Sequence, residues 1–173
     1  MSAGFGPPHA AVITVSDSVH AGTRADRSGP AVRERLEQLG WQVSVLETIP
    51  DEPDQIAQRL ATLADSHRLS AIFTTGGTGI SARDLTPEAT RRVIDREIPG
   101  LGELMRAKGR ESTPLAVLSR GVAGTRGKVL IVNLPGSPKG AVESLDAIVD
   151  LVPHMLELLN GETEHRAQPV ARS

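Results

Sequence analysis

The sequence predicts an α/β domain, a three-layer α/β/α sandwich around a mostly parallel central sheet. Short runs of branched apolar residues alternate along the chain with longer segments of helical apolar spacing, a pattern typical of parallel strands joined by helices. Glycine-rich turns follow several of these runs, as expected for tight strand-to-helix connections. The length of 173 residues suits one domain with an ample core. We therefore expect a single domain over residues 11–161, with flexible tails at 1–10 and 162–173.

The first strand and helix are predicted near the N-terminus. Ala11–Val15 is a run of small and branched apolar residues, typical of a buried strand, and Ser16–Ser18 closes it. Residues 20–27 are polar and contain glycine, which predicts a loop. A helix is expected from Ser28 to Leu39, with Gly40 ending it.

A second unit of the same kind follows. Residues 41–49 alternate in polarity and are rich in branched side chains, which predicts a strand. The turn at Pro50–Pro53 then opens a helix whose apolar spacing falls at Ile56, Leu60 and Leu63.

The third unit contains the most informative segment of the chain. Residues 71–74 predict a buried strand, and the glycine-rich stretch Thr75–Gly79 follows directly. Thr86 is expected to cap a helix in which Pro87 takes the first position and Glu88 lies in the first turn. A strand, a glycine loop and a helix in this order present amide donors to a phosphate group.

The last part of the chain predicts one further strand between helices. Residues 99–102 should break the chain before a short helix at about 103–108. Val129–Val132 is the last predicted strand. A long helix is expected over 138–159, with a kink or break at Pro153.

Polar residues and glycines follow the predicted strands at the points where those strands end. Because ligands of parallel α/β sheets bind beyond the carboxyl ends of the strands, four such loops on one rim form one site. These residues are Ser16 and Asp17 after the first strand, Asp51 after the second, Thr75–Gly79 and Asp84 after the third, and Asn133–Gly136 after the last.

Asp84 is an acid close to the predicted phosphate loop. An acid beside an anion requires a cation between them, which indicates metal-assisted phosphoryl or nucleotidyl chemistry. Simpler interpretations stay open from the residues themselves. In these interpretations, the glycine loop is a tight turn that binds no ligand, and Asp84 is a helix cap. Asp51 is an acid that the helix dipole favours at a helix start. Likewise, Arg120 is either a phosphate ligand or a surface charge.

Composition excludes several classes of partner. A net charge of −2, an aromatic content of 2% and the absence of tyrosine disfavour nucleic acid as a partner. Without cysteine, the chain has no disulfides, thiolate nucleophiles or cysteine-based metal sites. The sequence has no secretory signal and no membrane-spanning run, so we expect no membrane partner and a cytoplasmic location. The glycine loop lacks the Lys-Ser/Thr of a P-loop, and its glycine order disfavours a nicotinamide oxidoreductase.

Five motifs together resemble the Mog/MoaB family of molybdenum-cofactor proteins, which includes bacterial molybdopterin adenylyltransferase and the G domain of gephyrin. The likeness runs from about residue 11 to residue 161. The motifs are Thr75–Gly79, Arg83–Ala89, Ile98–Gly100, Leu118–Arg120 and Asn133–Gly136.

The resemblance implies an α/β sandwich, a homotrimer, and transfer of AMP from ATP to the terminal phosphate of molybdopterin. It implies that Asp51 and Asp84 are catalytic, and that Ser119, Asn133 and Ser16 contact the pterin substrate. From the chemistry of phosphate transfer, we hypothesise that Asp51 and Asp84 hold Mg²⁺, directly or through water. The resemblance also implies delivery of the product to a molybdate-inserting MoeA-like protein. The candidate substrate-binding residues are Ser16, Asp17, Thr75, Gly76, Gly77, Thr78, Gly79, Ser119, Asn133, Pro135 and Gly136.

The chain departs from several family members at Gly109, where they carry a serine linked to molybdopterin binding. Its shorter segment after Pro138 is similar to MoaB-type members, so a non-catalytic molybdopterin-binding or scaffold protein is the alternative to the enzyme. Retention of Asp51 and Asp84 favours the enzyme, because binding alone does not require acids beside phosphates. The sequence leaves open whether molybdenum or tungsten is the eventual metal.

Overall fold

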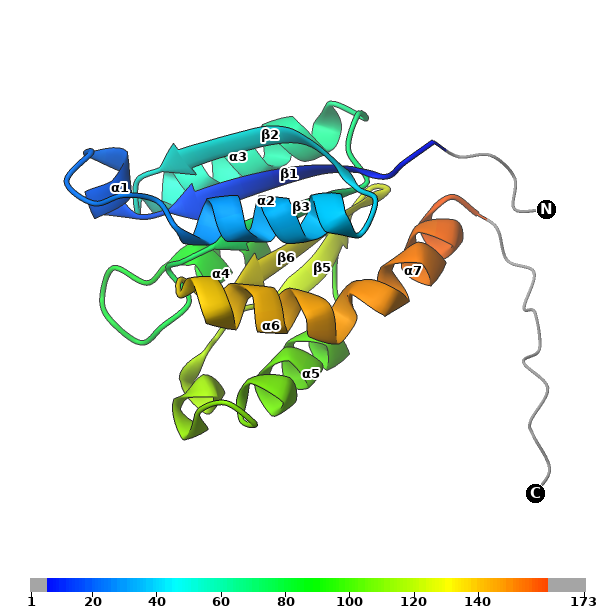
Figure 1. The fold of residues 1–173 in the computed structure, drawn as a ribbon. Coiled ribbons are helices and arrows are strands. Elements are labelled where there is room, and N and C mark those ends of the chain that lie inside the picture. The colour runs from blue at the N-terminus through cyan, green and yellow to red at the C-terminus, as the bar shows by residue number, and fades with distance from the viewer. Residues whose placement is uncertain (1–5, 162–173) are drawn as a thin grey trace, which may run out of the picture.

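The computed structural model describes residues 6–161 and has three layers, with a β-sheet between two layers of helices (Figure 1). Among these residues, six strands form one sheet in the order β2-β1-β3-β6-β5-β4. The strands are β1 (His9–Val15), β2 (Gln42–Ile49), β3 (Ala71–Thr75), β4 (Arg96–Glu97), β5 (Ala123–Arg126) and β6 (Val129–Leu134). The predicted α/β class and mostly parallel sheet are confirmed.

Strands β2, β1, β3 and β6 lie side by side and parallel. Their carboxyl ends therefore meet at one edge of the sheet, where ligands of open α/β sheets bind. One row across the sheet pairs Ile13 with Thr74 and Thr74 with Asn133. Strand β5 runs antiparallel to both β6 and β4, at the far side of the sheet.

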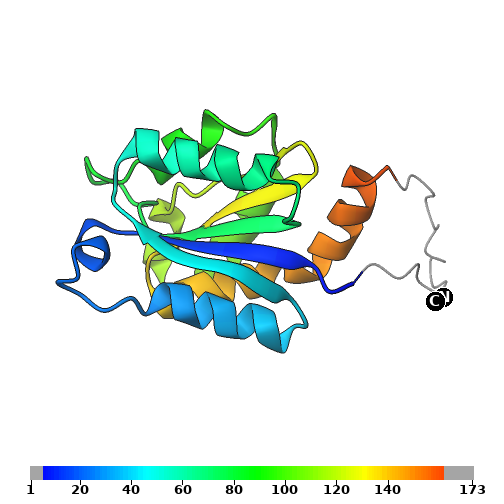
Figure 2. The same ribbon diagram turned by 90° about the horizontal axis from the view of Figure 1, so that it is seen from above.

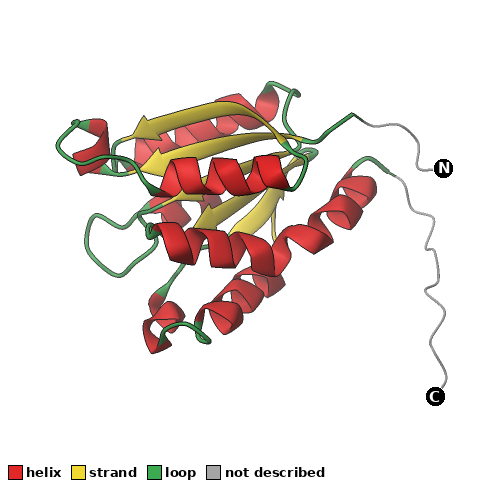
Figure 3. Ribbon diagram, viewed as in Figure 1, coloured by secondary structure: helices red, strands yellow, loops and turns green. Residues whose placement is uncertain are grey.

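Helices cover both faces of the sheet, as Figure 2 shows from above and Figure 3 shows by colour. Helices α3 and α4 pack on one face, and α2, α5, α6 and α7 on the other. The α-helices are α1 (Asp17–His20), α2 (Ser28–Gln38), α3 (Pro53–Asp65), α4 (Thr86–Arg91), α5 (Pro99–Gly109), α6 (Pro138–Ile148) and α7 (Val152–Leu159), and the 3₁₀ helices are η1 (Pro114–Leu118) and η2 (Val149–Leu151).

Alternate residues of the central strands fill the two halves of the core. Val12 and Phe73 point to the α2–α6 side, where the Phe73 ring packs edge to face against Trp41 with centroids 6.0 Å apart. Ile13 and Ile72 point to the α3–α4 side. Burial on both faces explains why these strands are continuous apolar runs in the sequence.

Several predicted boundaries are corrected by the structure. Helix α5 begins at Pro99 rather than near residue 103, since proline suits the first helical position and the following glycines do not prevent the helix. Thr86 is the first residue of α4 and not its N-cap, which is Leu85. The long C-terminal helix breaks at η2, and Pro153 lies in the first turn of α7. Gly40, with φ of +84°, follows the end of α2 as expected.

Four short elements have no counterpart among the predicted ones: α1, β4, β5 and η1. Strand β1 begins at His9, so it overlaps the predicted tail 1–10 by two residues. The first five residues and the predicted tail 162–173 lie outside the described residues. Within the described chain, none of the helices combines the length and apolar character needed to cross a bilayer.

Candidate active site

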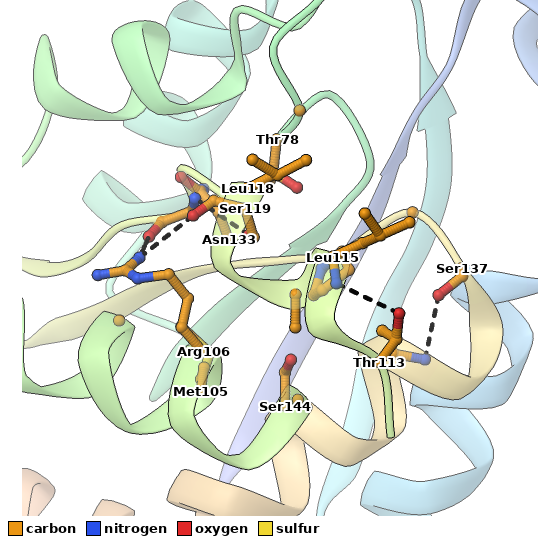
Figure 4. Close-up of a pocket in the computed structure, with 18 of the residues that line it drawn as sticks. Thr78, Met105, Arg106, Thr113, Leu115, Leu118, Ser119, Asn133, Ser137 and Ser144 are labelled. Atoms are coloured by element: carbon orange, nitrogen blue, oxygen red, sulfur yellow. Dashed lines mark hydrogen bonds between the residues drawn. The ribbon is translucent and has the colours of Figure 1, made fainter. Parts of the chain in front are cut away.

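Two cavities meet at the carboxyl edge of the sheet. The first, here the β1–α2 cavity, has a volume of about 770 Å³ and lies beside Ser16, Asp51 and Thr75. The second, the α5–α6 cavity, has a volume of about 470 Å³ and lies beneath η1 (Figure 4). Four residues line both: Gly77, Asp84, Gly136 and Ser137. Ligands of the two cavities would therefore approach each other at the glycine loop.

The glycine loop after β3 adopts a backbone conformation that is sterically unfavourable for residues with a Cβ atom. Gly76 and Gly77 have φ of +97° and +65°, in the left-handed region that favours glycine. A Cβ at Gly76 would collide with the carbonyl oxygen of Val15, and one at Gly77 with the hydroxyl of Thr86. The Thr86 hydroxyl instead donates to the Gly76 carbonyl at 3.0 Å. The turn is thus fixed between the end of β1 and the start of α4.

Asp84 lies against this loop and does not cap the helix that follows. Its Oδ2 accepts a hydrogen bond from the amide of Ser81 at 2.9 Å, and α4 has no side-chain cap. A Cβ added at Gly79 would lie 2.7 Å from the same Oδ2. The structure therefore contradicts the interpretation of Asp84 as a helix cap.

Asp51 faces the loop from the end of β2. The N-cap of α3 is Glu52, so Asp51 does not cap that helix either. Its Oδ1 would lie 3.2 Å from a Cβ added at Gly77. Together, Asp51 and Asp84 bring carboxylates to the β1–α2 cavity.

Asp17 and Asp51 hold each other through reciprocal hydrogen bonds. The Asp17 amide donates to Asp51 Oδ2 at 2.8 Å, and the Asp51 amide donates to Asp17 Oδ1 at 2.9 Å. Arg83 neutralises this acidic group from the third loop. Its guanidinium donates to Asp17 Oδ2 at 2.7 Å and to Glu52 Oε1 at 2.9 Å. The loops after β1, β2 and β3 are thereby joined.

These contacts change the acidities of the two aspartates in opposite directions. Partial burial raises the pKa of the Asp51 carboxyl, with the neighbouring charges of Asp17 and Asp84 adding to this effect. The Asp51 amide and the Arg83 guanidinium lower the pKa of Asp17. Asp51 is thus an acid whose negative charge a cation would stabilise.

Arg120 stabilises the glycine loop through hydrogen bonds to its backbone carbonyls. Its amide donates to the Thr78 carbonyl at 2.8 Å, and its Nε donates to the Gly79 carbonyl at 2.7 Å. The guanidinium also donates to the Asp84 carbonyl and pairs with Glu88. Arg120 is therefore bound within the protein and shapes the loop, rather than being a solvated surface charge.

Asn133 lies in β6 rather than after it, and its side chain is 1% exposed. Its amide nitrogen donates to the hydroxyls of Thr74 at 3.0 Å and Thr90 at 2.9 Å. Its Oδ1 accepts from the Val122 amide at 3.3 Å. The side chain lines the α5–α6 cavity while tying β3, β6 and α4 together.

The structure divides the predicted site residues between the two cavities. Asp17 lines neither, and it contacts Asp51 instead. The resemblance assigns Ser16, Ser119 and Asn133 together to the pterin substrate. In the structure, Ser16 lines a different cavity from Ser119 and Asn133. The β1–α2 cavity contains Ser16, Asp51, Thr75 and Gly76; the α5–α6 cavity contains Thr78, Gly79, Ser119, Asn133 and Pro135; and Gly77, Asp84 and Gly136 line both.

Sequence reasoning missed residues that helices bring to the cavities. Met105 on α5 and Ser144 on α6 line the α5–α6 cavity, and no local motif distinguishes them from core residues. Arg83 was detectable, since it adjoins Asp84 in a polar loop. Gly109 packs so closely that a Cβ there would lie 2.8 Å from the Cβ of Ala116. A serine at this position would therefore displace η1.

The carboxylates are suited to a magnesium ion. Mg²⁺ is bound by one or two carboxylates together with substrate phosphates and water, rather than by an all-protein cage. Asp51 and Asp84 supply hard oxygen donors beside the glycine loop. In the described part of the chain, no group of three or more His, Cys, Asp or Glu side chains could hold a metal ion.

Comparison with known proteins gives the family. The family model described as "Probable molybdopterin binding domain" matches residues 11–154. The chain belongs to the Mog/MoaB family. The molybdopterin adenylyltransferase of Helicobacter pylori strain J99 is 41% identical over 155 residues, covering 88% of each chain.

Solved structures of Mog/MoaB proteins share the fold. The molybdopterin biosynthesis enzyme MoaB of Thermus thermophilus matches with a TM-score of 0.83 and 51% identity, covering 89% of this chain and 97% of that one. The tungsten cofactor synthesizing protein MoaB of Pyrococcus furiosus matches with a TM-score of 0.81 and 34% identity, covering 90% and 99%.

The electrostatic role of Arg83 can be measured on the Asp51 carboxyl. We expect carbon-13 NMR titration to give Asp51 a pKa above its ordinary value. In Arg83→Ala it should rise further, because a nearby positive charge is lost. Arg92→Ala, which removes a distant surface pair with Asp54, is the control. Equal Asp51 pKa values in wild type and Arg83→Ala would contradict the assignment.

Asn133→Ala should destabilise the fold as well as alter the cavity. It leaves the buried hydroxyls of Thr74 and Thr90 without their donor, so we expect the free energy of unfolding to fall by about 1–3 kcal/mol. Urea denaturation measures this loss. Asn160→Ala, at the exposed end of α7, should stay within about 0.5 kcal/mol. An equally small effect for Asn133→Ala would show that its hydrogen bonds do not stabilise the sheet.

Proposed function

We propose that the protein is a molybdopterin adenylyltransferase of molybdenum cofactor biosynthesis. It transfers AMP from ATP to the terminal phosphate of molybdopterin and releases pyrophosphate. The observation that carries this proposal is the meeting of two cavities at a glycine loop flanked by Asp51 and Asp84. Relatives named molybdopterin adenylyltransferase, 40–41% identical over most of the chain, support it.

The two substrates are assigned to different cavities. Met105, Leu115 and Leu118 give the α5–α6 cavity apolar walls that suit a flat heterocycle, and Ser119 lies at its edge. The larger β1–α2 cavity receives ATP, whose phosphates face the backbone of the glycine loop. The terminal phosphate of molybdopterin and the α-phosphate of ATP then meet beside Gly77 and Asp84, which line both cavities.

The reaction needs positioning more than acid–base chemistry. A phosphate monoester is already an anionic nucleophile, so no side chain has to remove a proton from it. One of its oxygens attacks the α-phosphorus of ATP, a new P–O bond forms, and the bond to the pyrophosphate leaving group breaks. The loop holds the two phosphates in line, and Asp51 stays ionised opposite them.

Charge neutralisation is the remaining requirement. Mg²⁺ held by Asp51 and Asp84 would supply it by stabilising the negative charge on the ATP phosphates and on pyrophosphate. The Asp17 amide keeps Asp51 in place, and Arg83 in turn holds the Asp17 carboxylate. Arg120 fixes the carbonyls of the loop, so that its backbone amides keep their orientation.

A non-catalytic MoaB-type binding protein is the alternative function. Two acids placed against the glycine loop favour the enzyme, since they weaken anion binding unless a cation joins them. Titration with ATP, Mg²⁺ and molybdopterin separates the two. The enzyme releases one pyrophosphate per molybdopterin consumed, and a binding protein releases none.

The carboxylate of Asp84 should be essential for turnover. We expect Asp84→Asn to keep the fold and the molybdopterin affinity but to slow pyrophosphate release about 100-fold or more. The reason is that the Mg²⁺ that would neutralise the negative charge of the transition state loses a carboxylate ligand. Asp54→Asn, at an exposed surface pair, is the matched control. Unchanged turnover in Asp84→Asn would remove the residue from the chemistry.

We also propose a homotrimer in which every subunit contains a complete site. All the proposed site residues come from one domain, and closed symmetric oligomers are common among soluble proteins. The adenylylated product would then pass to a molybdate-inserting MoeA-like protein.

Sedimentation equilibrium should give three times the chain mass of 18.3 kDa. When wild-type subunits are mixed with Asp51→Ala/Asp84→Ala subunits, activity should follow the wild-type fraction linearly. A monomer would contradict the trimer, and a steeply non-linear loss would show that subunits share their sites.

A further inference from the structure

The α5–α6 cavity has chemically different ends. At one end lie the glycine loop and Asp84, and at the other lies the face of α6. The face of α6 is set by helical spacing, because residues three and four apart lie on one side of a helix. These cavity-lining residues are Ser137, Gly140, Glu143 and Ser144. At 1.5 Å per residue, Ser144 lies roughly 10 Å along the helix from Ser137.

Ser144 offers a hydrogen-bonding group that the protein does not use. Its side chain is 4% exposed, and its hydroxyl contacts no hydrogen-bond partner within residues 6–161. No polar side-chain atom in the described chain is both sealed from solvent and unpaired, so this hydroxyl must open into the cavity. Figure 4 shows its oxygen pointing from α6 toward η1. A hydroxyl that opens into the cavity can donate a hydrogen bond to a ligand there or accept one from it.

Glu143 supplies a carboxylate beside that hydroxyl. Its side chain is 27% exposed, and Oε1 accepts a hydrogen bond from the Ser112 hydroxyl at 2.7 Å. Lys139 lies 3.7 Å away and is 77% exposed, so it neutralises the acid weakly. The Oε2 atom is left to accept a hydrogen bond from a ligand. An acid without a strong counterion repels phosphate and attracts N–H donors.

These features orient the substrate. A phosphate is favoured at the loop end, where Thr78 and the backbone of Gly79 line the cavity, and disfavoured beside Glu143. Thr78 and Ser144 lie on opposite sides of η1 in Figure 4. The ring system of a pterin must therefore extend toward α6. Its pyrimidine edge carries an amino group next to a ring N–H, two donors in a row, with a carbonyl beyond them.

We propose that Glu143 and Ser144 recognise this edge of the pterin: the carboxylate accepts from the amino group and ring N–H, and the hydroxyl bonds to an adjacent ring atom. This proposal rests on the proposed function, because it assigns the pterin to the α5–α6 cavity. It makes Glu143 and Ser144 specificity residues at the end opposite the reacting phosphate. They bind the ring and take no part in adenylyl transfer.

Separate probes for the two ends of the cavity test this assignment. The probe for the ring is 6-hydroxymethylpterin, which lacks the phosphorylated chain, and the probe for the phosphate end is inorganic phosphate. Each is measured as a competitor of molybdopterin binding by Glu143→Gln, Ser144→Ala and wild type. Glu103→Gln, an exposed acid on α5 that lines neither cavity, is the matched control.

We expect Glu143→Gln to weaken the affinity for 6-hydroxymethylpterin about 10- to 100-fold, because a hydrogen bond to a charged group is lost. Ser144→Ala should weaken this affinity about 3- to 10-fold, because a hydrogen bond between neutral groups is lost. Inhibition by inorganic phosphate should stay unchanged in both variants. In the transfer reaction, KM for molybdopterin should rise while kcat stays within about twofold, because the lost contact serves the ground state and transition state alike.

Each other outcome overturns the proposal. Equal 6-hydroxymethylpterin affinity in wild type and both variants would mean that the ring lies elsewhere. Parallel losses of affinity for 6-hydroxymethylpterin and inorganic phosphate would reduce the two residues to a structural role. These results are distinct from failure of the proposed function, which would appear as a wild-type protein that binds molybdopterin and ATP but releases no pyrophosphate.

Discussion

The left-handed turn at Gly76 and Gly77 is the constraint on which the candidate active site depends. Its two positive φ values and the absence of side chains let β3 turn directly against the carbonyl end of β1 and the start of α4. Any Cβ in this turn would push the loop outward. The loop would then no longer lie at the junction of the two cavities. Asp51 and Asp84 would no longer flank its backbone.

The turn also concentrates negative charge, and the surrounding residues balance it. Asp17, Asp51 and Asp84 come from three different loops, and Arg83 neutralises part of this group at its exposed side. Arg120 neutralises Glu88 behind the loop. The charge that remains faces the cavity, where a cation with phosphate ligands would complete the balance. In the proposed function, the ligand would supply part of the electrostatics that these acids require.

Much of the fold follows from the sequence, because buried parallel strands are continuous apolar runs and the helices between them have clear periodicity. Strands β4 and β5 were not predictable in this way. Arg96–Glu97 has two charged residues, and Ala123–Arg126 lacks a branched apolar run, so both depend on pairing within the sheet. The start of α5 was misplaced for a similar reason, since Pro99 and Gly100 indicate a break as readily as a helix start.

For the site, the sequence indicated which loops converge but not how the residues divide between cavities. Ser16 directly follows a predicted strand and Ser119 directly follows an apolar segment, so their sequence positions are alike. They nevertheless line different cavities. Asn133 is polar in an apolar strand because Thr74 and Thr90 satisfy it from other elements. Ser144 and Met105 depend on the packing of α5 against α6, which local patterns do not encode.

The central claim is that adenylyl transfer is direct, from a nucleotide in one cavity to a phosphate in the other. The stereochemistry at the α-phosphorus tests this most directly, with ATP made chiral there by oxygen isotopes and sulfur. One in-line attack across the junction at Gly77 and Asp84 predicts inversion of configuration in the adenylylated molybdopterin. Retention would require a second displacement through a covalent enzyme intermediate and would contradict the account.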